Sequence, residues 1–211
     1  MMGVEAQNRS IGFEQTREWK KVIKKAKKEK KLIFVDCYTS WCGPCKMLAK
    51  DVFTRDEVAD YFNANFVCAK YDMEKDADGV ILKDRFGVKA FPTLVFVDPA
   101  TQQVVHRMAG SADWMFAGAK LANDPQNNLS AMIKRYEAGE RGEQFLSAYL
   151  AALSAAYMAE EQGKVAAEYL NSLSEEQLAT KENWELVKKY VSDPLSEPLK
   201  KVMQNRDKFY A

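Results

Sequence analysis

Two cysteines with the spacing Cys-X-X-Cys are the residues of this chain best suited to chemistry. Cys42 and Cys45 lie in the sequence WCGPC at residues 41–45. Cysteines at this spacing either supply half of a zinc site or form a redox-active dithiol. Residues 32–38 (LIFVDCY) predict a buried strand before the motif, and a helical pattern follows it. Cys42 is therefore expected at a helix N-terminus, where unpaired N–H groups and the helix dipole stabilise a thiolate.

The two residues between the cysteines suit that position. Gly43 allows a tight approach, and Pro44 fits the first helical turn, where its missing N–H costs little. Cys45 then lies one turn further into the helix. At that distance it can close a small disulfide ring with Cys42.

A metal site is not expected, because zinc requires four ligands and the other candidates are dispersed. Cys37 and Cys68 are isolated in apolar strand runs, and the single histidine, His106, is expected to be exposed beside a hairpin. The two isolated cysteines should be buried on opposite faces of a sheet, where they cannot form a bridge.

The elements that must position the dithiol alternate between strands and helices. Strands are predicted at 32–38, 66–72, 94–97 and 103–108, and helices at 14–31, 45–52, 57–63 and 80–86. This alternation, followed by a terminal hairpin, predicts an α/β sandwich with a mixed sheet.

After Gly110 the strand patterns end and the chain is expected to be all-α. Helices are predicted at 113–123, 129–138, 145–161, 165–173, 181–191 and 198–206. Breaks are predicted at 124–125, 139–142, Gly163 and 193–194. Three segments follow from these patterns: an N-terminal fringe at 1–12, an α/β domain at 13–124 and a helical C-terminal extension at 125–211.

The WCGPC motif after a buried strand resembles the thioredoxin family, over about residues 32–110. Asp36 matches that family's buried aspartate, Lys70 the lysine beside it, Phe91-Pro92-Thr93 the loop with a cis-proline facing the disulfide, and Gly110 the glycine after the last strand. The resemblance implies a thioredoxin-like three-layer sandwich. It also implies no cofactor other than the Cys42–Cys45 disulfide.

The resemblance further implies that the Cys42 thiolate attacks a disulfide of a partner protein and that Cys45 resolves the mixed disulfide. Burial would raise the pKa of Asp36 and make it a proton acceptor for Cys45, or else Asp36 forms a partly buried ion pair with Lys70. The residues expected to contact substrate are Trp41, Gly43, Pro44, Phe91 and Pro92.

Three functions are compatible with these residues. The Gly-Pro pair resembles the reducing members of the family, so we expect a protein-disulfide reductase whose partners are disulfide-containing proteins and an upstream electron donor. The first alternative is a disulfide oxidase or isomerase on the same fold. The second is an interaction module whose helical extension binds a partner.

Composition limits the other partners. The chain has 31 Lys+Arg and 30 Asp+Glu, so its charge of +1 gives no general reason to expect nucleic acid or an anionic membrane. No uninterrupted apolar run reaches the roughly 18 residues of a membrane span. The lysine-rich helix at 14–31 either faces solvent or lies on an anionic membrane or nucleic acid.

The first residues bear on location. Val4, Glu5 and Ala6 resemble a signal-peptidase site, although a charged region and an apolar region are missing before them. The protein is therefore expected in the periplasm or otherwise outside the cytoplasm. The alternative is an ordinary frayed terminus of a cytoplasmic protein.

Overall fold

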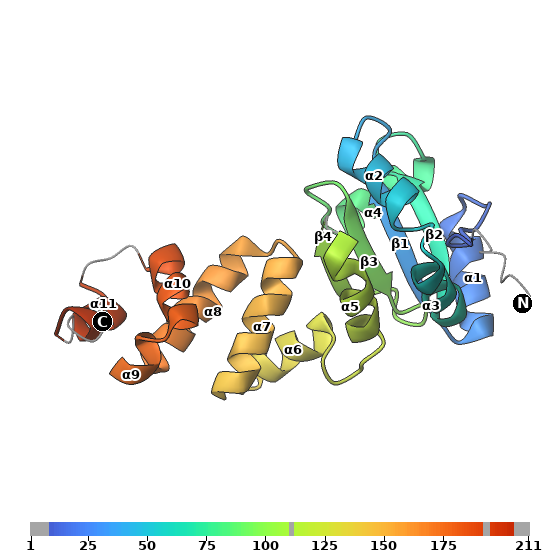
Figure 1. The fold of residues 1–211 in the computed structure, drawn as a ribbon. Helices are drawn as coiled ribbons and strands as arrows, with labels where there is room; N and C mark the ends of the chain where they lie inside the picture. Colours follow the sequence, from blue (N-terminus) through green and yellow to red (C-terminus); the bar gives the residue numbers. More distant parts are fainter. Residues whose placement is uncertain (1–8, 110–111, 192–194, 205–211) are drawn as a thin grey trace, which may run out of the picture. The chain divides into compact units, whose positions relative to one another are not determined.

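The chain divides into two compact units, residues 1–135 and 136–211. The computed structural model describes residues 9–109, 112–191 and 195–204, and Figure 1 shows its helices and strands. Residues 1–8 of the predicted fringe at 1–12, with the Val4–Ala6 pattern, and Gly110 lie outside these residues. The division between the units falls after the boundary near residue 125 that the sequence predicts.

A four-stranded mixed sheet in the order β2-β1-β3-β4 forms the centre of the first unit (Figure 1). Its strands are β1 (Leu32–Tyr38), β2 (Phe66–Asp72), β3 (Thr93–Val97) and β4 (Val104–Ala109). β1 runs parallel to β2 and antiparallel to β3, and β3 and β4 form the predicted hairpin. β1 and β2 have the predicted bounds, because each is a short apolar run between polar ends.

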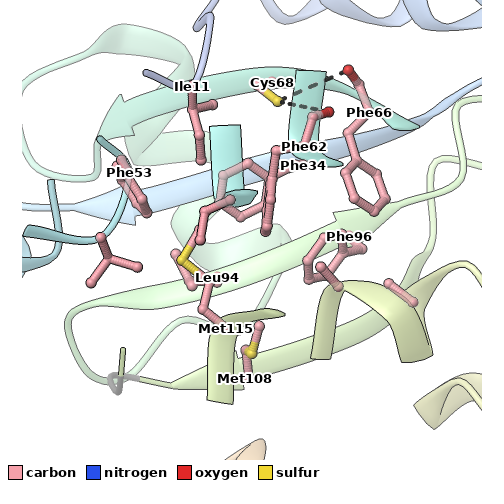
Figure 2. Close-up of a cluster of buried hydrophobic side chains, with 14 of the residues drawn as sticks. Ile11, Phe34, Phe53, Phe62, Phe66, Cys68, Leu94, Phe96, Met108 and Met115 are labelled. Atoms are coloured by element: carbon pink, nitrogen blue, oxygen red, sulfur yellow. Dashed lines mark hydrogen bonds between the residues drawn. The ribbon is translucent and has the colours of Figure 1, made fainter. Parts of the chain in front are cut away.

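In the described part of the chain, five helices accompany the sheet and a sixth crosses the division between the units. They are α1 (Trp19–Glu29), α2 (Gly43–Asp51), α3 (Asp56–Asn65), α4 (Ala77–Arg85), α5 (Ala112–Ala122) and α6 (Leu129–Glu137). On one face of the sheet, Phe34 and Phe96 pack with Phe62 of α3 and Met115 of α5 (Figure 2). On the other face, α1 and α4 cover a second core. Helices on both faces make the predicted three-layer sandwich.

The first helix begins five residues later than predicted, at Trp19 rather than Glu14. Phe13 forms a bridge with Cys68, and the N–H of Glu14 bonds the carbonyl of Cys68, so this segment lies extended beside β2. The helix ends at Lys30, which has a left-handed conformation. Backbone bonding to the sheet therefore overrides the helical pattern of residues 14–18.

His106 is buried, at 2% exposure, and the prediction that it is exposed was wrong. Its Nδ1 accepts the N–H of Leu129 at 3.2 Å, the first residue of α6. Burial lowers the pKa of this imidazole to about 4, so it stays neutral and able to accept. Through this bond, the start of α6 belongs to the first unit.

The second unit contains α7 (Glu143–Ala155), α8 (Ala159–Ser172), α9 (Glu175–Leu178), α10 (Lys181–Tyr190) and α11 (Glu197–Gln204). The predicted helix at 145–161 is wrong, because the chain breaks at Tyr157, which has a positive φ of 54°. The predicted break at Gly163 is also wrong, since this residue lies inside α8. Among the described residues, no helix is both long enough and apolar enough to cross a membrane.

Candidate active site

The dithiol sits where β1 leads into α2. Cys42 is the N-cap of α2, and its N–H bonds the carbonyl of Thr39 at 3.2 Å. The N–H of Cys45 donates to Cys42 Sγ at 3.1 Å. The two sulfur atoms are joined in a disulfide, with Cα atoms 5.3 Å apart. A free helical N–H is thus aimed at the first sulfur, as the sequence predicts.

The open side of the disulfide is the Gly43-Pro44 turn. Both cysteines are buried, whereas Gly43 and Pro44 are exposed. A Cβ atom placed on Gly43 would meet nothing within 4 Å, so this glycine makes no close approach to the chain itself. The space around it is available to another molecule.

Asp36 and Cys45 line one small cavity of about 180 Å³, together with Lys70. Asp36 is 5% exposed, and its Oδ1 has no hydrogen-bond partner in the described residues. Burial raises the pKa of this carboxyl to about 7, although the charges of Lys70 and Arg17 partly oppose the shift. The cavity therefore holds a carboxyl that can exchange a proton near neutral pH beside the second cysteine.

Lys70 pairs with Asp36 in the register of β1 and β2 but does not form a salt bridge with it. Its side chain is exposed, and its Nζ lies 5.3 Å from the centre of the Phe13 ring. The alternative of a partly buried Asp36–Lys70 ion pair is therefore wrong. Lys70 instead acts on Asp36 through its charge at longer range.

Two of the predicted docking residues, Trp41 and Phe91, are in contact, and Trp41 directly precedes Cys42. The Phe91–Pro92 peptide bond is cis, as expected, and the rings of Trp41 and Phe91 meet edge to face, 6.0 Å apart. Trp41 is 66% exposed, and its indole N–H donates to Glu74 at 2.8 Å. Trp41 therefore offers an apolar surface held by two neighbours.

Two residues of the site were missed by the sequence analysis, Glu74 and Asp72. The oxygens of Asp72 accept the N–H groups of Ser40 at 3.1 Å and Glu74 at 3.0 Å, tying the turn after β1 to the turn after β2. A Cβ on Gly79 of α4 would lie 2.3 Å from the Asp72 carbonyl, so only glycine fits there. An acidic residue at a strand end is too common a pattern to have identified this role.

Nothing in the described residues gathers three or more His, Cys, Asp or Glu side chains around a possible metal ion. The remaining cysteines, Cys37 and Cys68, are free and lie in the cores on opposite faces of the sheet, as predicted.

Comparisons with known proteins agree with this geometry. Residues 15–99 match the family described as thioredoxin-like. Thioredoxin H4 of Arabidopsis thaliana is 33% identical over 101 residues, which cover 48% of this chain and 78% of the relative. Thioredoxin H5 of the same plant is 35% identical, covering 44% and 72%. The solution structure of a Bacteroides thetaiotaomicron protein assigned as a disulphide-isomerase is 44% identical, covers 57% of this chain and 98% of that one, and has a TM-score of 0.50.

The mixed sheet, the helix-capped dithiol and these relatives define a thiol–disulfide oxidoreductase, which acts through its cysteine pair. The chain belongs to the thioredoxin family. The match to the family lies within the first unit.

Proposed function

We propose that this protein reduces disulfide bonds in other proteins. The Cys42 thiolate attacks one sulfur of the substrate disulfide, and the other sulfur leaves as a thiolate. Cys45 then loses its proton and attacks Cys42 Sγ, which releases the second substrate thiolate. The substrate gains two electrons, and the Cys42–Cys45 pair ends as the disulfide.

The observation that carries this proposal is the N–H of Cys45 aimed at Cys42 Sγ, at the N-terminus of α2. This donor and the helix dipole favour a negatively charged sulfur, which lowers the cost of forming the attacking thiolate.

Asp36 is the proton acceptor for the second step. It lines the same cavity as Cys45, and its pKa of about 7 suits an exchange near neutral pH. The proton leaves the thiol of Cys45 for the carboxylate as the mixed disulfide is resolved.

Substrate docking is assigned to the exposed side of the disulfide. Trp41 and Phe91 provide apolar contact, and the open space at Gly43 admits an extended segment that pairs with the backbone at Pro92. The oxidised pair must then be reduced again, so an electron donor is a required partner. Location outside the cytoplasm stays a prediction, which cell fractionation tests.

The test is the reduction potential of the Cys42–Cys45 pair, measured by equilibration with dithiothreitol or glutathione, alongside reduction of insulin. A potential closer to about −270 mV than to about −120 mV, with insulin turnover, is expected. The Cys42→Ser variant should lose turnover, and Cys45→Ser should trap the mixed disulfide. A strongly oxidising potential or no turnover would contradict the proposal.

Disulfide isomerisation is the second candidate, favoured by the 44% identity to the Bacteroides protein assigned as a disulphide-isomerase. An isomerase needs only the attack of Cys42 on the substrate and its later release by a substrate thiolate. Cys45→Ser would therefore still reactivate a scrambled substrate. Loss of reactivation in this variant, with insulin reduction intact in the wild type, favours the reductase.

A further inference from the structure

The outer face of α1 carries a row of lysines that the redox chemistry does not use. Lys20, Lys24, Lys27 and Lys28, named here the lysine stripe, are exposed. Their spacing of three, four and eight residues places them on one side of the helix. The opposite side, with Val22 and Ala26, is buried in the core.

The positive charge of the lysine stripe is not neutralised by ion pairs in the described residues. The neighbouring Lys21 and Lys25 form ion pairs with Glu18 and Glu14. In the described part of the chain, no ion pair involves a member of the stripe. Four uncompensated cations within one exposed helix face form a strong local field, although the net charge of the whole chain is only +1.

A groove of about 710 Å³ continues from the C-terminal end of the stripe. Its lining includes Lys27, Lys30 and Lys31, together with Asn65 and the turn at Asp98. The N–H of Ala100 donates a hydrogen bond to Asp98 Oδ1 at 2.7 Å. Lys31 is paired with Glu29 at 3.6 Å, so Lys27 and Lys30 supply the positive charge of the groove. These two lysines outnumber the single lining carboxylate, which partly opposes them, and the polar lining offers hydrogen-bonding groups.

We propose that the lysine stripe and this groove dock an extended acidic segment of a partner protein. Lys20, Lys24 and Lys28 are four residues apart, about 6 Å along the helix axis. Alternate side chains of an extended chain are about 6.6 Å apart. Acidic side chains at every second position thus match the lysine spacing, and the segment continues into the groove.

Two other anionic partners fit less well. A membrane-bound helix inserts its apolar face, but the apolar face of α1 is already covered by the core. A single-stranded nucleic acid needs exposed rings for base stacking. The ring in the groove, Tyr61, instead packs against Phe62, Phe66 and Phe116.

The groove lies at the end of β1 that is far from the dithiol. β1 begins at Leu32, which lines the groove, and ends at Tyr38, just before the active-site turn. Seven residues of strand separate the two ends by about 20 Å. A partner held at the stripe would present a tethered disulfide at raised effective concentration.

The test measures binding of a short fluorescein-labelled peptide of alternating glutamate and serine to the full chain by anisotropy. The triple variant Lys20→Gln, Lys24→Gln, Lys28→Gln should weaken binding about tenfold or more, and salt should weaken wild-type binding. Glutamine keeps a helix propensity close to that of lysine, so α1 should remain folded. Circular dichroism checks this.

The matched control is Lys50→Gln, Lys75→Gln, Lys89→Gln, which removes the same charge from exposed lysines outside α1. It should bind the peptide like the wild type. Equal loss in both triple variants, or no wild-type binding, would overturn the proposal. So would tighter binding to a thymidine oligonucleotide or to phosphatidylserine vesicles than to the peptide.

Discussion

Two buried carboxylates lie on the neighbouring strands β1 and β2, and their surroundings differ. Asp72 is 4% exposed, and its oxygens accept the N–H groups of Ser40 and Glu74. Asp36 is 5% exposed, and its Oδ1 accepts nothing within the described residues. Burial without donors disfavours a charged carboxylate, whereas N–H donors compensate for it. Hydrogen bonding, rather than depth, therefore separates a carboxylate that holds a loop from one that can carry a proton.

The largest effect is expected in the kinetics of Asp36→Asn. Resolution of a mixed disulfide on Cys42 should slow by about 10²–10⁴-fold, because the variant lacks the base that accepts the Cys45 proton. In the wild type the rate should rise with pH through about 7, as Asp36 ionises, and this rise should vanish in the variant. Single-turnover release of a labelled substrate thiol measures the step. An unchanged pH profile would show that Asp36 is not the acceptor.

Asp36→Asn should make the folded chain more stable at high pH, although it slows the reaction. Asp36 ionises at about 7 in the folded chain but near its ordinary pKa of 3.8 when unfolded. Its contribution to stability is therefore full below pH 3.8 and lost as pH rises through 7. Asp36→Asn should exceed the wild type by about 2–4 kcal/mol in unfolding free energy at pH 8, and differ little at pH 4. Urea unfolding at both pH values gives the comparison, and a gain of equal size at both would refute it.

Asp72→Asn should instead destabilise the fold. The substitution replaces one accepting oxygen with an NH₂ group that faces an N–H donor, so a partly buried donor loses its partner. We expect a loss of about 1–3 kcal/mol at pH 8, where Asp36→Asn gains stability. Changes of opposite sign in the unfolding free energies of Asp36→Asn and Asp72→Asn, measured in one urea series, would sharpen the contrast. Equal signs would remove it.

The smallest effect is expected from Glu74→Ala, which removes the exposed acceptor of the Trp41 indole. The loss of stability should be below about 1 kcal/mol, because water replaces the carboxylate. The KM for insulin should rise a few-fold with kcat unchanged, since Trp41 loses one of its two positioning contacts. A fall in kcat alone would place Glu74 in the chemistry rather than in docking.

The sequence predicts the sheet and the dithiol turn well because both depend on local patterns. The apolar runs of β1 and β2 have clear ends, and Cys42 and Pro44 have types that suit a helix start. The Asp36 cavity could be expected only through the family resemblance. Its lack of a salt bridge depends on where the Lys70 side chain points, which the strand pattern does not determine.

The wrong or missing sequence predictions have two causes: contacts between distant residues and helix breaks that no residue type marks. His106 is buried because α6, more than 20 residues later, begins against it. Gly163 costs a helix only about 1 kcal/mol and is tolerated inside α8. The real break, at Tyr157, has no glycine or proline to mark it. Glu74 was missed because its indole partner comes from a distant loop.

The burial of the two free cysteines has a practical consequence for assays. Four cysteines less the two in the disulfide leave Cys37 and Cys68, and burial raises the pKa of both thiols. Thiol reagents react with accessible thiolates, so Cys37 and Cys68 should not react while the chain is folded. Colour from a thiol reagent on the native protein would then count reduced active sites directly. The same reagent added with denaturant would report both hidden thiols, giving an internal standard in every sample.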